Sequence, residues 1–241
     1  MDDLEVYNLL EVLKMSTRQN YQAELDNINE SVHAMSADIV HAIDKTLFAF
    51  QNKSVILANE IMKHDDAVDA MEYEIEERCI NIVIREQPMA SDWRKIASYM
   101  RMIGDMERIA DHCCDIAIYV KHLASCDSVQ EPQHISDMYY IMKQMVVDTF
   151  KSFTDSNPAL ASDVINMDDK VDIYFKEINN EIAGLMKQNS EGIRQYMDYV
   201  MINKYIERMA DHAANIADWV SFVVNGQLKL KFTDRYKKES D

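Results

Sequence analysis

The chain has 241 residues, which is enough for one large domain or two small ones. Its formal net charge of −17 repels phosphate backbones, so nucleic acid is excluded as a partner, and metal cations or basic protein surfaces are favoured. With only 4 glycines and 3 prolines, and with 48% of residues apolar, the chain is predicted to be all-α, with long helices and an ample core.

Three helices are predicted in the first half from apolar residues that recur with a period near 3.6. The first runs through Leu25 to Ile43 and ends near Asn52, and the second stops before Pro88. The third starts near Ser91 and continues to residue 124. A polar segment with Pro132, residues 125–133, is predicted to be a linker.

The second half repeats this plan. A fourth helix begins at Ile135, and Asn157 before Pro158 has the pattern of an N-cap followed by proline at the first helical position. The fifth helix ends at a turn at Asn189-Ser190, and the sixth is stopped by Gly226. We therefore predict two tandem antiparallel three-helix bundles.

The predicted domain boundaries follow from these elements. Residues 1–19 form an N-terminal extension, 20–124 the first bundle, 125–133 the linker, 134–225 the second bundle, and 226–241 a polar basic tail. The extension has no counterpart in the second half and is predicted to be an amphipathic helix.

The start of the chain and its cysteines favour a cytoplasmic location. Acidic residues stand where a secretory leader would be basic and apolar, and no apolar run approaches the ~20 residues of a membrane span. The four cysteines lack CxxC spacing and are expected to be reduced thiols.

An internal repeat is the strongest signal in the sequence. The eleven residues from Glu107 to Ala117 return one hundred positions later, from Glu207 to Ala217, with seven of them identical. Such a repeat indicates that the chain is built twice from one unit. Both copies keep a Glu and an Asp four residues apart, which places both carboxylates on one helix face.

Four acidic residues in each half are predicted to meet at one level of a helical hairpin. Residues equidistant from a turn face each other, and Asp65 and Asp111 each lie twenty-three residues from Pro88. The same symmetry, about Pro88 or about Asn189-Ser190, sets the positions of the other predicted ligands: Asp69, Glu107, Asp168, Asp172, Glu207 and Asp211. Asp115 extends the first row outward and is a further candidate ligand.

Four carboxylates held close together repel one another unless a cation or bound protons compensate for the charge. Oxygen-rich sites of this kind suit magnesium, calcium, manganese, iron or zinc, and bridging carboxylates favour more than one ion. A solvated acidic face without metal is the alternative, and Arg108 and Arg208 are near enough to assist neutralisation. His112 and His212 are expected to point further from the core than the carboxylates, as surface groups, as capping groups or as ligands.

These residues resemble the PhoU family of phosphate-signalling regulators. The family pattern has Glu/Asp-x-x-x-Asp twice in each of two bundles and matches the eight positions above. The segment Glu-Arg-x-Ala-Asp-His is also close to the family's own sequence motif. The resemblance covers about residues 20 to 225 and includes the loop from Gln87 to Asp92.

The resemblance implies a non-enzymatic, cytoplasmic regulator, often a homodimer. Such proteins link the ATPase subunit of a phosphate transporter to a sensor histidine kinase and repress the phosphate-starvation response, a role compatible with peripheral association at the membrane. It also implies iron, zinc, manganese or magnesium ions on the repeated motifs, in some members as multinuclear clusters.

Two other readings remain open at this stage. A helical interaction module without metal fits the apolar stripes equally well. A ferritin-like di-iron oxidase requires inward-pointing Glu-x-x-His motifs, for which Glu30 with His33 is the helical candidate and Glu131 with His134 falls in the linker.

Overall fold

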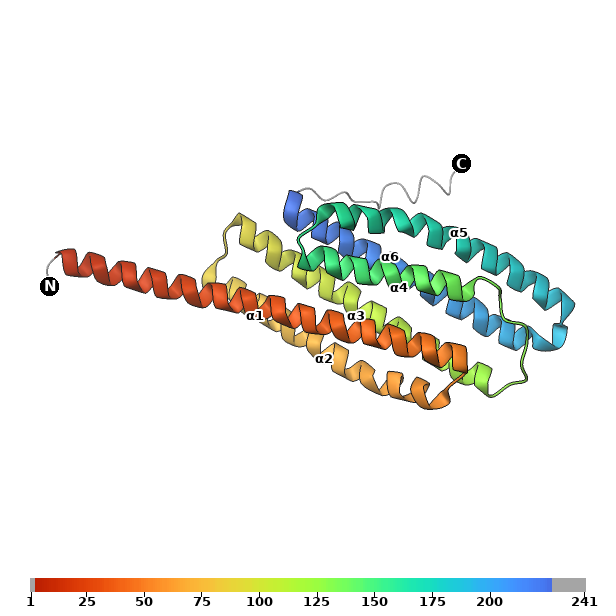
Figure 1. Cartoon of the computed structure of the whole chain (residues 1–241). Helices are drawn as coiled ribbons and strands as arrows, with labels where there is room; N and C mark the ends of the chain where they lie inside the picture. The colour runs from red at the N-terminus through yellow and green to blue at the C-terminus, as the bar shows by residue number, and fades with distance from the viewer. Residues whose placement is uncertain (1–2, 227–241) are drawn as a thin grey trace.

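The computed structural model describes the backbone of residues 3–226 and the side chains of residues 20–226. Within that part of the chain there are six α-helices and no strand. They are α1 (Asp3–Asn52), α2 (Val55–Glu86), α3 (Ala90–Ala124), α4 (Ile135–Thr154), α5 (Pro158–Gln188) and α6 (Ile193–Asn225), with a short 3₁₀ helix, Ser190–Gly192, before α6 (Figure 1). The predicted all-α architecture of two successive three-helix units is confirmed.

The first helix is longer than the bundle repeat requires. α1 is one continuous helix from Asp3 to Asn52, so the predicted boundary between residues 19 and 20 falls inside it. The amphipathic pattern predicted for residues 1–19 concerns side chains outside the described residues, and so does the basic tail beyond Gly226.

Local sequence signals set the ends of several helices. Ser54 caps α2, since its side chain accepts a hydrogen bond from the Leu57 amide, and Gln87 ends α2 in the left-handed conformation with φ 46°. Asn157 caps α5 by accepting from the amides of Ala159 and Leu160, as the sequence predicted. Gly226 ends α6 with φ 72°, a conformation that glycine adopts without steric cost.

The two bundles lie side by side along their length, with α3 and α6 between them (Figure 1). α3 and α6 make the most extensive contact of any two helices, and α1 also packs on α4. One hydrogen bond crosses the same boundary, because the Tyr139 hydroxyl on α4 donates to the Ile43 carbonyl on α1 at 2.9 Å. Within the second bundle, the Thr149 hydroxyl donates to the Ala213 carbonyl at 3.2 Å and joins α4 to α6.

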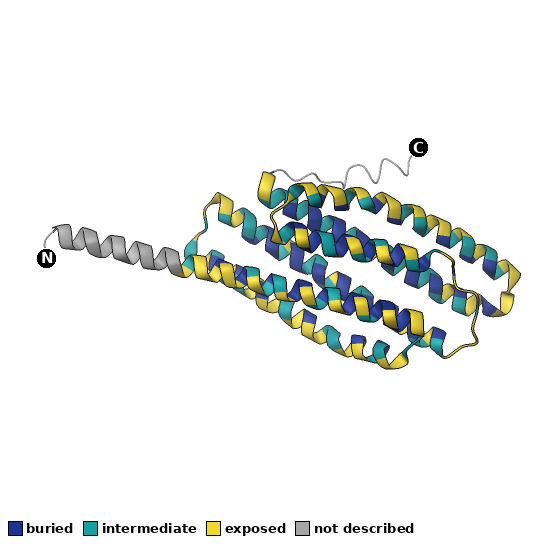
Figure 2. Cartoon of the chain, in the orientation of Figure 1, coloured by how far each residue is buried: buried dark blue, intermediate teal, exposed yellow. Residues whose placement is uncertain are grey.

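The repeated segments in α3 and α6 occupy equivalent positions in the core. Ile109 and Met209 are fully buried, and so are Ile116 and Ile216, whereas Arg108 and Arg208 are both exposed. Figure 2 shows that the buried residues of these two helices follow the boundary between the bundles. The internal repeat is therefore a repeat of packing as well as of sequence.

No helix among the described residues combines the length and the apolar character that crossing a membrane demands.

Candidate functional site

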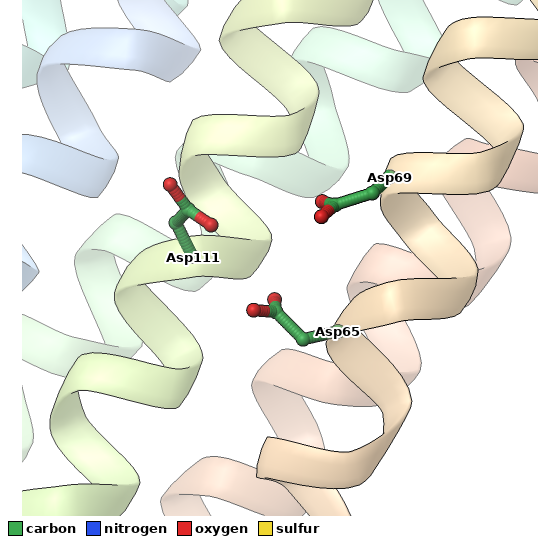
Figure 3. A group of neighbouring side chains, drawn as sticks. All are labelled: Asp65, Asp69 and Asp111. Atoms are coloured by element: carbon green, nitrogen blue, oxygen red, sulfur yellow. The ribbon is translucent and has the colours of Figure 1, made fainter.

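Three of the predicted carboxylates meet in the first bundle. α2 supplies Asp65 and Asp69, α3 supplies Asp111, and one oxygen from each lies within 4.8 Å of the other two (Figure 3). The side chains point toward one another across the gap between the two helices. The hairpin symmetry about Pro88 accounts for this meeting, because it puts Asp65 and Asp111 at the same height.

The environment of Asp65 suits a cation. Burial raises the pKa of Asp65, and the charges of Asp111 and Asp69 raise it further, against the contact with Cys114. Its Oδ1 atom is buried and has no hydrogen-bond partner among the described residues. An ionised carboxylate only accepts, so a bound cation would satisfy that oxygen and remove the repulsion together. The donor set of three carboxylates fits a hard divalent ion.

Glu107, the fourth predicted ligand, stands outside this group but interacts with it electrostatically. Burial raises the pKa of Glu107 to about 7, and the charges of Asp111, Glu72 and Asp69 add to this effect. Arg108 opposes it, since its Nε lies 3.3 Å from Glu107 Oε2 and its guanidinium also reaches Asp111 Oδ2 at 2.7 Å. Arg108 thus supplies part of the positive charge that the carboxylates require.

The second bundle does not repeat the close approach. Among residues 20–226, Asp65, Asp69 and Asp111 form the one group of three or more potential ligands that meets the 4.8 Å limit. Asp168 is 6% exposed and Asp172 is half-buried, so these two acids on α5 differ in their surroundings. Asp168, Glu207 and Asp211 each take part in an interaction within the protein.

The expectation that His112 and His212 point further from the core than the carboxylates is wrong for Asp69 and Asp111. The two histidine side chains are 12% and 20% exposed, against 28% for Asp111 and 14% for Glu107, and Asp69 is exposed. The two rings lie against each other at the boundary between the bundles, with centroids 5.6 Å apart. Because α3 and α6 are buried both within their own bundles and against each other, each has a second buried face, and the histidines occupy it.

Each of these histidines is held by a carboxylate. His112 Nδ1 lies 3.1 Å from Asp115 Oδ2, and His212 Nδ1 lies 2.7 Å from Asp105 Oδ1. Asp115 therefore belongs with His112 and not with the three clustered carboxylates. Burial lowers the pKa of His112, and His212 lowers it further, whereas Asp115 raises it.

The di-iron alternative finds no support in the geometry of its motif. Glu30 is exposed on α1, and His33 packs against Phe153 with ring centroids 5.2 Å apart. Glu131 is also exposed. These residues do not form the inward-facing carboxylate and histidine arrangement that a di-iron centre requires.

A pocket beside Asp65 contains residues that sequence reasoning passed over. His41, Lys45 and His64 line it together with Asp65 and Cys114, and it lies between α1, α2 and α3. His64 Nε2 lies 2.7 Å from Asp38 Oδ2. The histidines belong to helices α1 and α2, outside the repeated segment, so the repeat gave no signal for them.

Comparison with protein families gives two matches to a single domain model. The PhoU domain matches residues 32–120 and again residues 135–220. Both copies lie within the two helical bundles, and the gap between them contains the loop from α3 to α4.

Curated relatives resemble most of the chain. The phosphate-specific transport system accessory protein PhoU homolog of Aquifex aeolicus is 33% identical over 185 residues, which cover 77% of this chain and 84% of that protein. The protein of the same description from Clostridium acetobutylicum is 27% identical over 212 residues and covers 88% of this chain and 97% of its own length.

Solved structures agree with the fold. PhoU from Pseudomonas aeruginosa superposes with a TM-score of 0.84 and 27% identity, covering 86% of this chain and all of that one. The phosphate transport system regulatory protein PhoU from Streptococcus pneumoniae gives a TM-score of 0.80 at 27% identity, covering 86% of this chain and 98% of that one.

Proposed function

Because this chain belongs to the PhoU family, we propose that it is a cytoplasmic regulator that couples the ATPase subunit of a phosphate transporter to a sensor histidine kinase and represses the phosphate-starvation response. The observation that carries the proposal is the pair of PhoU domains, which together span both bundles. Relatives described as accessory proteins of phosphate-specific transport match this chain along most of its length. We propose that it acts as a homodimer and without enzymatic activity.

Deletion of the gene in its own host tests the regulatory role. We expect phosphate-responsive transcription to rise in phosphate-rich medium and to return to the repressed level when the chain is supplied again. Co-purification with the transporter ATPase and with the kinase tests the coupling directly. Unchanged transcription after deletion would remove the regulatory proposal, and repression without either partner would remove the coupling.

We further propose that the regulator carries metal ions on its carboxylates. The support is the convergence of Asp65, Asp69 and Asp111 and the buried oxygen of Asp65, which has no partner among the described residues. A hard ion such as Mg²⁺ or Mn²⁺ suits three carboxylates, and iron or zinc would be bound by the same oxygens. The ion would neutralise the cluster and strengthen the contact between α2 and α3.

Elemental analysis of protein purified without chelators tests this part. We expect the triple variant Asp65→Asn, Asp69→Asn, Asp111→Asn to lose at least one metal ion per chain. The matched control replaces three exposed residues by asparagine, Asp127, Asp155 and Asp163, with the same change in net charge. Equal metal content in both variants would reject the site.

The second set of predicted ligands is tested separately. We propose that a second metal site lies in the second bundle, on Asp168, Asp172, Glu207 and Asp211. A cation there would have to draw the carboxylate oxygens of these residues to within the 4.8 Å that separates the ligand atoms of the first cluster. Replacing all four by their amides should then remove metal beyond the loss seen in the first triple variant. An unchanged metal content would confine the site to the first bundle.

A metal-free interaction module is the second candidate function. Arg108 favours it, since this side chain pairs with both Glu107 and Asp111 and so compensates for part of their charge without an ion. The same elemental analysis separates the two functions, because a module without metal would contain none in the wild-type protein.

A further inference from the structure

We propose that His112 and His212 form a second metal site, specific for a borderline-soft divalent ion such as Zn²⁺, that joins the two bundles. The site lies at the boundary between α3 and α6, whereas the carboxylate cluster lies between α2 and α3. Asp111 and His112 are neighbours in sequence, yet Asp111 meets residues of α2 and His112 meets residues of α6. The proposal therefore stands or falls independently of the carboxylate site.

The first argument is the way each ring is held. Histidines that bind metal almost always give their other ring nitrogen to a carboxylate or carbonyl, which fixes the tautomer and the ring orientation. Here Asp115 holds Nδ1 of His112 at 3.1 Å, and Asp105 holds Nδ1 of His212 at 2.7 Å. An ionised carboxylate can only accept, so Nδ1 donates in both rings, and the neutral form of each ring then has its lone pair on Nε2.

The second argument is the state of His112 Nε2. This atom is buried and has no hydrogen-bond partner among the described residues. A buried nitrogen with a free lone pair is costly unless something binds it. The ring is closed in by Tyr205, whose centroid is 5.2 Å from that of His112, and by His212.

The third argument is the distance between the rings. Zn–N bonds of about 2.0–2.1 Å in tetrahedral geometry place the centroids of two imidazoles bound through Nε2 roughly 5 Å apart. The centroids of His112 and His212 are 5.6 Å apart. The spacing of the two rings is therefore compatible with one ion bound through both Nε2 atoms, with water in the coordination positions that the two histidines leave open.

The repeat explains why the two halves supply the site together. Residues 105 and 205 are equivalent, and each contacts the histidine of the other half: Asp105 hydrogen-bonds to His212, and Tyr205 packs on His112. Asn215, the counterpart of Asp115, donates to Asp105 at 3.4 Å and so helps to orient the carboxylate that holds His212. The two histidines are thus equivalent in the repeat, and each contacts position 105 or 205 of the other half.

Zinc titration by calorimetry tests the site in a background that removes rival ligands. This background carries Asp65→Asn, Asp69→Asn and Asp111→Asn, with Cys126→Ser because Cys126 is an exposed thiol. It also replaces the proposed ligands of the second bundle by their amides: Asp168→Asn, Asp172→Asn, Glu207→Gln and Asp211→Asn. We expect one Zn²⁺ per chain, with affinity lowered at least tenfold by His112→Ala and also by His212→Ala. The matched control, His134→Ala, removes a histidine that pairs with nearby Asp137 and packs on Tyr174 of α5, and it should leave the affinity unchanged.

A spectroscopic measurement covers the case in which the multiple variant fails to fold. With one equivalent of Cu²⁺, the wild-type chain should give an electron paramagnetic resonance spectrum with hyperfine coupling to two imidazole nitrogens. His112→Ala and His212→Ala should each leave one. Zinc should also raise the melting temperature of the wild type by more than that of either variant, because the variants keep only the carboxylate ligands. Spectra and zinc affinities that are the same with and without the two histidines would overturn the proposal.

Discussion

The Arg108 guanidinium donates a hydrogen bond of 2.7 Å to Asp111 Oδ2 and so brings a positive charge of the protein's own to the carboxylate cluster. The Nε atom of the same side chain lies 3.3 Å from Glu107 Oε2. Arg108 is exposed, so its attraction is screened by water and limited in strength. A metal ion at Asp111 would compete with this arginine for the same oxygen.

Replacement of Arg108 by glutamine should therefore strengthen metal binding at the cluster. An exposed ion pair is worth about 0.5–1 kcal/mol, so we expect a gain of about two- to fivefold in Mn²⁺ affinity, measured by calorimetry. The control is Arg101→Gln, which removes an exposed arginine from the same helix at a position away from the cluster. Affinity that falls, or that rises equally in the control, would show that Arg108 does not compete with the ion.

Glu107 should make the metal-free protein less stable as the pH rises. Its folded pKa of about 7 lies above the value of about 4.3 expected for an unfolded chain. Between these values the folded state binds the additional proton, so its stabilising effect is complete at low pH and is lost as the pH passes through 7.

We expect Glu107→Gln to flatten this dependence, since the amide stays neutral. In EDTA, the difference in unfolding free energy between pH 5.5 and pH 8 should shrink by roughly 2 kcal/mol, as measured by urea denaturation. Glu77→Gln, at an exposed position on α2, should keep the wild-type dependence. If both variants follow the wild-type curve, Glu107 titrates near its ordinary value.

Tyr139→Phe should weaken the contact between the bundles without affecting metal. The buried Tyr139 hydroxyl donates to the Ile43 carbonyl at 2.9 Å and so joins α4 to α1. Loss of one such hydrogen bond costs about 1 kcal/mol, which chemical denaturation can measure. Tyr140→Phe, at the exposed neighbouring position, should cost less than half as much, and equal losses would contradict the assignment.

Asn157→Ala should destabilise the start of α5. The Asn157 side chain accepts from the amides of Ala159 and Leu160 at 3.1 and 3.2 Å, and the loss of an N-cap costs about 1 kcal/mol. Thermal unfolding measures this loss, and Asn157→Asp should restore most of the stability because aspartate caps equally well. An aspartate variant as unstable as the alanine variant would point to a different role for this residue.

The sequence was sufficient to predict the elements and part of the site. The helices could be located because the chain has few glycines and prolines and because Asn157 has the pattern of an N-cap. The hairpins could be located from the turn residues Pro88 and Asn189. Counting residues from Pro88 then predicted that Asp65 and Asp111 would share one height, and the structure brings them together with Asp69.

Height along a hairpin does not determine the rotation of each helix about its axis. The same counting about Asn189-Ser190 applied to Asp168 and Asp211, yet those acids do not form an equally close group among the described residues. Predicting that difference needs the packing of α5 on α6, which depends on many side chains at once.

The histidines were misplaced for a different reason. A helical wheel drawn for one bundle assigns a single buried face, and His112 lies beside that face. α3 buries a further face against α6, and this contact depends on how the two halves dock rather than on the period within either half. The position of His112 against His212 could therefore be seen only in the assembled pair of bundles.

The packing of α3 on α6 also predicts what would happen if the chain were cut between its two bundles. Among the described residues, a short loop between Ala124 and Ile135 is the covalent connection between the halves, and the packing of α3 on α6 holds them together. A protease cut in that loop would leave two fragments, each with an uncovered apolar helix face that fits the other. Such fragments should reassemble when mixed, and one half alone should pair with a copy of itself through the same helix face.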